Sequence, residues 1–165
     1  MKNIFLFFLS ISSFSFFGQE KLDNLLKTWN KRNVPYISVE TLAMPKSTAI
    51  LLDARELEEF NVSHLQNALR VGYNTFDLKN TISKLPNDKN TKIVVYCSLG
   101  IRSETIAHQL IQSGYTNVFN LYGGIFEWKN NDFQVVDTLG KPTEKVHAFN
   151  KSWGKWLKKG KKIYD

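Results

Sequence analysis

The chain has 165 residues, of which 42% are hydrophobic and 22% are charged. These globular proportions allow one folded domain with short extensions and exclude a disordered or collagen-like chain. The formal net charge of +7 is concentrated near the C-terminus, where residues 138–165 hold eight lysines and two acidic residues, a net +6. Basic residues interspersed with Phe149, Trp153 and Trp156 could bind nucleic acid or a membrane surface, but a solvated face on a packed tail is the simpler interpretation.

The first nineteen residues have the order of a secretory signal peptide. A short basic start precedes an apolar and serine-rich segment over 4–17, and Gly18 and Gln19 form a small polar exit. The apolar segment is short for a membrane span. We therefore expect residues 1–19 to be removed on export, which leaves a periplasmic or extracellular protein with no stable membrane span. An uncleaved N-terminal anchor is the alternative, and nucleic acid is not an expected partner of an exported protein.

Short apolar runs alternate with segments of helical periodicity after a first helix expected over 20–32. The runs predict strands at 36–38, 49–52, 68–71, 92–96 and 117–121. The periodic segments predict helices at 39–44, 56–60, 75–85, 104–112 and 125–129. This alternation predicts an α/β fold with a parallel sheet of about five strands and helices on both faces. The predicted organisation is a signal peptide (1–19), an N-terminal helix and linker (20–36), the α/β domain (37–136) and a basic aromatic extension (137–165).

Cys97 is the single cysteine, so the sequence excludes an internal disulfide and a cysteine-based zinc site. An unpaired thiol is a liability in an oxidising compartment, which suggests that this one has a chemical use, although a buried structural cysteine is the alternative. The three histidines, His64, His108 and His147, are scattered without carboxylate spacing. We expect no metal site and no cofactor.

Cys97 is expected at the turn between the fourth predicted strand and the helix that follows it. The first amide N–H groups of a helix lack intrahelical partners and the helix dipole adds about half a positive charge there, so a thiol at this point ionises more easily. Gly100 permits a tight turn. Arg102 adds a fixed cation with a planar fork that suits an oxyanion. The loop is therefore a candidate nucleophile within an anion cradle.

Several segments, in order and spacing, resemble a single-domain rhodanese, which is a persulfide-forming sulfurtransferase. The matching segments are 51–55, 59–64, 96–103, 110–115 and 118–125 with Trp128. The resemblance covers about 100 residues and implies a rhodanese-like fold in which Cys97 accepts sulfane sulfur. It implies that the substrate-binding loop consists of Ser98, Leu99, Gly100, Ile101, Arg102 and Ser103. The supporting residues that it suggests are Asp53, Arg55, His64, Gly123 and Gly124.

The supporting residues have structural interpretations as well as chemical ones. Asp53 and Arg55 are expected to form an ion pair or to cap the chain after a strand, in preference to acid–base chemistry. His64 stands where the family usually has Gly-His-Ile, but serine replaces the glycine here, and a packed loop histidine is preferred to a proton-transfer group. Gly123 and Gly124 are expected to turn close behind the cysteine loop, where glycine allows the backbone to approach.

The last two residues of the loop also have structural interpretations. Arg102 either holds the anionic end of a donor or pairs with a nearby carboxylate such as Glu104 or Glu127. Ser103 suits a helix N-cap, and this structural role is preferred to a chemical one. Four residues separate Cys97 from Arg102, whereas the pattern of cysteine-dependent phosphatases has five, so the smaller cradle favours a sulfur atom over a phosphate group.

The expected function is that of an exported sulfurtransferase. Sulfur would pass from a donor such as thiosulfate through a Cys97 persulfide to a thiol or a cyanide-like acceptor. The alternative is a non-catalytic rhodanese-like binding module whose basic tail engages a protein partner or an envelope surface. A redox-linked thiol carrier ranks below both, because the chain has no second cysteine to resolve a mixed disulfide.

Overall fold

The computed structural model describes residues 12–45 and 47–164, and these residues divide between Lys31 and Arg32 into two compact units. The first unit holds α1 (Ser12–Trp29). This helix begins earlier than expected, inside the predicted signal peptide, and ends before the predicted limit. Much of that signal peptide, residues 1–11, lies outside the described residues, so its cleavage stays a prediction. None of the described helices combines the length and apolar character that crossing a bilayer requires.

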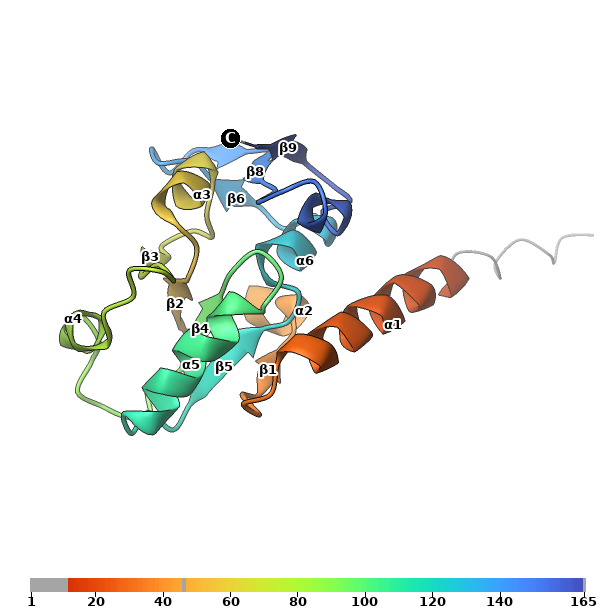
Figure 1. Cartoon of the computed structure of the whole chain (residues 1–165). Coiled ribbons are helices and arrows are strands. Elements are labelled where there is room, and N and C mark those ends of the chain that lie inside the picture. The colour runs from red at the N-terminus through yellow and green to blue at the C-terminus, as the bar shows by residue number, and fades with distance from the viewer. Residues whose placement is uncertain (1–11, 46, 165) are drawn as a thin grey trace, which may run out of the picture. The chain divides into compact units, whose positions relative to one another are not determined.

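The second unit is built on a sheet of five parallel strands, as the alternating pattern predicts (Figure 1). The strands are β1 (Tyr36–Ile37), β2 (Ile50–Asp53), β3 (Leu69–Arg70), β4 (Ile93–Tyr96) and β5 (Val118–Leu121). Their order is β1-β5-β4-β2-β3, and each neighbouring pair is parallel. All four residues of β4 are buried, which explains why the sequence of this strand is continuously apolar rather than alternating.

Helices connect the strands and surround the sheet. They are α2 (Val39–Ala43), α3 (Leu57–Val62), α4 (Leu78–Ser83), α5 (Arg102–Gln112) and α6 (Gly124–Asn130). The helix α5 packs on β4 and β5, where its Ile106, Ala107 and Leu110 join Ile93 and Val95 in a hydrophobic cluster. This packing fixes the end of β4 against the start of α5, where the cysteine loop lies.

The C-terminal extension folds onto the same unit. The preceding domain ends in β6 (Val135–Val136), and the extension holds β7 (Pro142–Thr143), β8 (Lys145–His147), the short 3₁₀-helix η1 (Trp153–Lys155) and β9 (Lys161–Ile163). β6 pairs antiparallel with β7, β8 pairs parallel with β9, and β8 packs on α3. Val146, Ala148 and Leu157 are fully buried. The extension is therefore part of the folded unit, with its lysines on the surface.

Candidate active site

Cys97 lies at the first position after β4, at the strand-to-helix turn that the sequence predicts. Residues 97–100 are all buried, and the cysteine is fully shielded from solvent. The start of α6 holds the loop from behind, because the Ile125 N–H donates to the Cys97 carbonyl at 2.9 Å and the Phe126 N–H donates to the Ser98 carbonyl at 3.1 Å. The backbone of the loop is thereby fixed independently of the thiol.

The glycine pair before α6 allows this close approach. Gly123 and Gly124 both have positive φ, 65° and 57°. A Cβ on Gly124 would lie 2.2 Å from the Cys97 carbonyl oxygen and 2.8 Å from the Ser98 carbonyl oxygen. Only glycine fits at this point, which is the position behind the cysteine loop that the sequence predicts.

The thiol of Cys97 has two polar neighbours. The Gly100 N–H donates to Sγ at 3.1 Å, and Gly100 has the positive φ of 94° that aims it there. The Ser103 hydroxyl lies 3.5 Å from Sγ, but it also lies 2.7 Å from Asn120 Oδ1 and has one proton to donate. The backbone amide is therefore the primary stabilising group for a thiolate.

Ser103 does not cap the helix, contrary to the sequence-based expectation. The helix α5 begins at Arg102 with Ile101 in the N-cap position, so Ser103 lies inside the first turn and its hydroxyl turns toward β5. The Asn120 amide accepts from this hydroxyl and donates to the Gly100 carbonyl at 2.7 Å. The sequence analysis missed Asn120, although a buried amide within the apolar strand β5 is a recognisable signal.

Arg102 forms a closed pair with Glu59 of α3. Nη1 and Nη2 of Arg102 each lie 2.7 Å from a Glu59 carboxylate oxygen, and Nη2 also lies 2.9 Å from the Ser98 hydroxyl. Ser98 in turn donates to Glu59 at 3.0 Å. Neither carboxylate suggested by the sequence is the partner: Glu104 binds Arg32, and Glu127 accepts from the Asn130 and Asn131 side chains.

The charges in this pair shift both pKa values toward the ionised forms. Burial acts to raise the pKa of Glu59, but the hydrogen bonds and charge of Arg102 outweigh it and lower the pKa below its usual 4.5. Burial acts to lower the pKa of Arg102, and the hydrogen bonds of Glu59, with the charges of Cys97 and Glu59, outweigh it and raise the pKa. The guanidinium is thus a permanent positive charge that acts on Cys97.

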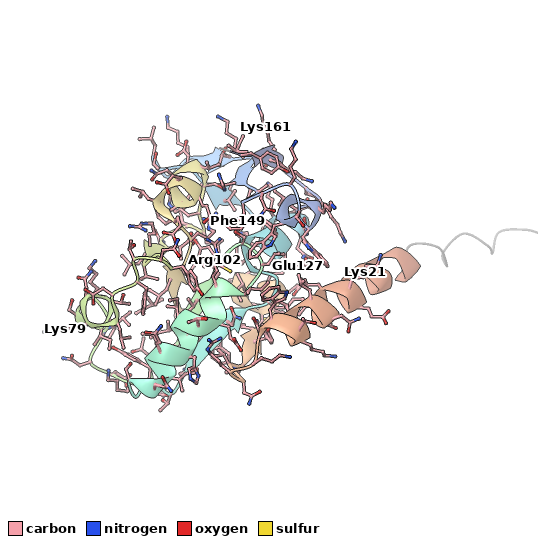
Figure 2. The ribbon with its side chains drawn as sticks, viewed as in Figure 1. Lys21, Lys79, Arg102, Glu127, Phe149 and Lys161 are labelled. Atoms are coloured by element: carbon pink, nitrogen blue, oxygen red, sulfur yellow. The ribbon has the colours of Figure 1, made fainter. Side chains whose placement is uncertain are left out.

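Two rings of the C-terminal extension contact this guanidinium. The Arg102 guanidinium carbon lies 4.8 Å from the centroid of Phe149 and 5.9 Å from that of Trp153, both within the range of a cation–π contact. Figure 2 shows Phe149 beside Arg102. The extension therefore covers the Arg102 side of the loop.

Asp53 and Arg55 form a fully buried ion pair at the end of β2. Arg55 Nη2 lies 2.6 Å from Asp53 Oδ2, and the same nitrogen donates to the Ser63 carbonyl at 2.7 Å. The Arg55 guanidinium also lies over the Tyr96 ring at 5.7 Å, and burial raises the pKa of that phenol. The Tyr96 hydroxyl accepts from the Leu65 N–H at 3.1 Å. These contacts give the pair a structural role between β2, β4 and the loop after α3.

His64 packs on Phe60 and beside β6 rather than against the thiol. Its ring stacks on Phe60 with centroids 3.9 Å apart, and Nδ1 lies 3.1 Å from the Phe60 carbonyl. Its backbone exchanges hydrogen bonds with Val136 of β6 at 2.9 Å. Leu99 is buried in the loop and Ile101 is partly exposed. Within the described part of the chain, no group of three or more His, Cys, Asp and Glu side chains is placed to hold a metal ion.

Sequence comparisons identify similar proteins. A family described as "Rhodanese-like domain" matches residues 39–131. Two curated relatives are named tRNA uridine(34) hydroxylase. The Erwinia tasmaniensis protein is 39% identical over 82 residues, 48% of this chain and 23% of the relative. The Hamiltonella defensa protein is 38% identical over 107 residues, 64% of this chain and 28% of the relative. The match spans about a quarter of the length of these relatives.

Solved structures share the fold. A rhodanese-related protein from Thermoplasma volcanium superposes with a TM-score of 0.54 and 26% identity, over 62% of this chain and 97% of that one. A thiosulfate sulfurtransferase from Pseudomonas aeruginosa gives a TM-score of 0.58 at 21% identity, over 85% of this chain and 26% of that one. The second likeness concerns the fold alone.

Proposed function

The chain belongs to the rhodanese-like domain family, which matches its residues 39–131, and we propose that it is a sulfurtransferase that carries sulfane sulfur on Cys97. The observation that supports this most directly is the 3.1 Å contact from the Gly100 N–H to Sγ. A backbone donor aimed at sulfur stabilises a thiolate and, after transfer, the persulfide anion that replaces it. The nearby Arg102 charge acts in the same direction.

The proposed reaction has two balanced displacements. The Cys97 thiolate attacks the sulfane sulfur of a donor, a new S–S bond forms, and the electron pair of the broken donor bond leaves with the rest of the donor. A thiolate or cyanide-like acceptor then attacks the terminal sulfur, and the electron pair of the Cys97–sulfur bond restores the thiolate. Ping-pong kinetics follow from this scheme.

The guanidinium fork of Arg102 suggests a role in holding the anionic end of a donor, but its contacts favour another role. Both terminal nitrogens are hydrogen-bonded to Glu59, so the fork is occupied in this structure. Arg102 fixes Ser98 through its hydroxyl and supplies positive charge to the loop. We propose that it positions and polarises the cysteine loop. The names of the tRNA-modifying relatives do not carry over, because the matched region is about a quarter of those proteins.

Sulfur loading of Cys97 tests the proposed function. The purified protein is incubated with thiosulfate or with a polysulfide, and intact-mass spectrometry should show one added sulfur atom. Cys97→Ser should remove the added mass and the turnover, while its thermal unfolding should show an intact fold. Sulfur transfer that persists in Cys97→Ser would exclude Cys97 as the residue that carries the sulfur.

Export belongs to the same proposal and rests on the pattern of residues 1–19. The test is the N-terminal sequence of the protein recovered from its native cell, together with cell fractionation. Cleavage close to Glu20 and recovery outside the cytoplasm are expected. An intact N-terminus on a cytoplasmic protein would overturn this part.

A second candidate function is a non-catalytic module that binds a partner through the basic extension. The exposed lysines of residues 138–165 favour it. Deleting the extension would not test it, because Val146 and Leu157 are buried in the fold. Replacing exposed Lys151, Lys155 and Lys158 with glutamate is the better experiment. A pure binding module should lose partner association, with no sulfur loading before or after the change.

A further inference from the structure

The C-terminal extension places two aromatic rings on the arginine of the cysteine loop. Phe149 and Trp153, here called the aromatic lid, lie outside the region that matches the family, residues 39–131. Their ring centroids are 4.6 Å apart and both rings contact the Arg102 guanidinium. The lid therefore belongs to the C-terminal extension and not to the matched domain.

The fold holds the lid in place through a constrained backbone. Phe149 has a φ of 64°, a left-handed conformation that a bulky side chain rarely adopts. Such a conformation persists where the surrounding structure over-determines it, and it is often found at functional sites. Here the Phe149 N–H donates to His147 Nδ1 at 3.2 Å, and the Trp153 N–H donates to Asn150 Oδ1 at 2.8 Å. The rings are thus positioned by the turn between β8 and η1.

The lid and Glu59 together leave Arg102 little capacity to bind an anion. Glu59 occupies both terminal nitrogens, and the buried Nε has no hydrogen-bond partner among the described residues. Of the five guanidinium N–H groups, three donate to Glu59 and Ser98, so two remain for a ligand, one on Nε and one on Nη1, in surroundings that include two aromatic rings. A sulfonate group has three oxygens and needs several donors once it leaves water, because an unpaired charge is costly in such surroundings.

A sulfur chain has different requirements from a sulfonate. The sulfur atoms of a polysulfide are polarisable, and they pack favourably against aromatic rings. Resting on the sulfurtransferase function proposed above, we propose that the aromatic lid is a specificity-determining element that favours polysulfide or persulfide donors over thiosulfate. It does so by covering the Arg102 side of the loop and by keeping Arg102 paired with Glu59.

Three variants of the full-length protein separate the lid from general damage. Phe149→Asn removes one ring and retains a residue type that tolerates positive φ. Trp153→Ala removes the other ring. Trp156→Ala is the matched control: it lies directly after η1, it is partly buried as Trp153 is, and the ring contacts of Arg102 within the described chain are with Phe149 and Trp153.

The first readout is the ratio of two Cys97 loading rates, from thiosulfate and from inorganic tetrasulfide, measured by intact-mass spectrometry. Both lid variants should raise the thiosulfate-to-tetrasulfide ratio by about tenfold, and the control should stay within about twofold of the unmodified protein. A ratio that stays within the control's range in both lid variants overturns the proposal. An equal rise of the thiosulfate-to-tetrasulfide ratio in Trp156→Ala also overturns the proposal.

The second readout, alkylation of Cys97 by iodoacetamide, needs no enzyme activity. Both lid variants should be alkylated about tenfold faster than the unmodified protein and the control. If no donor loads any form of the protein, the proposed sulfurtransferase function fails, and with it the selection of donors. Faster alkylation of the lid variants would then still establish the lid as a cover, whereas unchanged alkylation would remove that as well.

Discussion

At the scale of single residues, the thiol is surrounded by groups that its own loop and β5 provide. The N–H of Gly100 reaches Sγ directly, and the Asn120 amide holds both the Gly100 carbonyl and the Ser103 hydroxyl. The sequence predicts that Cys97 and Gly100 lie close together, because both belong to one short loop. It does not predict Asn120, which reaches the loop only when β5 pairs with β4.

Gly124 is the residue whose backbone approach can be tested most directly. Gly124→Ala should lower the free energy of unfolding by about 3 kcal/mol, because its Cβ would lie 2.2 Å from the Cys97 carbonyl oxygen. Gly140→Ala is the control: it has a similar positive φ of 72° with no atom within 4 Å, and should cost only about 1 kcal/mol. Urea unfolding measures both, and equal losses would contradict the close-approach argument.

Glu59 gives a prediction that depends on pH. Glu59→Gln should destabilise the protein at neutral pH by about 3 kcal/mol, because it leaves the buried Arg102 charge without its counter-ion. The folded-state pKa of Glu59 lies below 4.5, so its stabilising effect is complete above pH 4.5 and is lost as the pH falls through that lower value. The stability difference should therefore narrow in acid.

Unfolding free energies at several pH values measure this effect. Glu58→Gln is the matched control, because Glu58 is the exposed neighbour on the same helix, and it should change stability by less than about 0.5 kcal/mol. A difference between Glu59→Gln and the unmodified protein that stays constant from neutral to acidic pH would exclude the ionised pair as its source.

At the scale of elements, the α/β pattern and the extension differ in how well the sequence predicts them. Strands β2, β4 and β5 are mostly apolar and at least half-buried, so their positions follow closely from the sequence. Strand β8 has one exposed and two buried residues, and strand β9 has two exposed residues and one half-buried residue, so both are short runs with lysine at the exposed positions. Such runs carry no clear period, and only pairing with each other and packing on α3 makes β8 and β9 strands.

The extension should unfold together with the rest of its unit. Leu157→Ala should cost about 3 kcal/mol, the loss expected of a core leucine, because Leu157 is fully buried. Leu139→Ala should be close to neutral, since Leu139 is 76% exposed. Urea unfolding followed by circular dichroism and by tryptophan fluorescence should give coincident transitions. A separate early transition in fluorescence would show that the extension is an independent element.

At the scale of the whole molecule, folding hides the single thiol. Cys97 is fully buried, although the sequence places it in a loop, and loops normally lie on the surface. Cys97 is buried although it lies in a loop because α6 packs behind the loop and the extension packs over Arg102. An unpaired cysteine is thus protected from unwanted oxidation while the fold is intact.

This protection predicts how the protein behaves toward oxidation. In an oxidising buffer, the folded protein should remain a thiol monomer, because two buried Cys97 side chains cannot approach to disulfide distance. In concentrated urea the same buffer should produce disulfide-linked dimers. Non-reducing electrophoresis after quenching with an alkylating agent distinguishes the two, and Cys97→Ser should give no dimer in either buffer. Dimers formed by the folded protein at the rate of the unfolded chain would refute the protection.

The sequence by itself determined the parallel α/β architecture, the position of Cys97 after a buried strand and the need for glycine behind it. The first two features depend on local periodicity and on nearby residue types, which the sequence displays directly, and the third follows from the resemblance to the rhodanese family. Only the tertiary structure decided the partner of Arg102. Glu104 and Glu127 are as plausible in sequence as Glu59, and the choice depends on how α3 meets the start of α5. The same holds for Phe149 and Trp153, whose contact with Arg102 exists only because the extension folds back over α3.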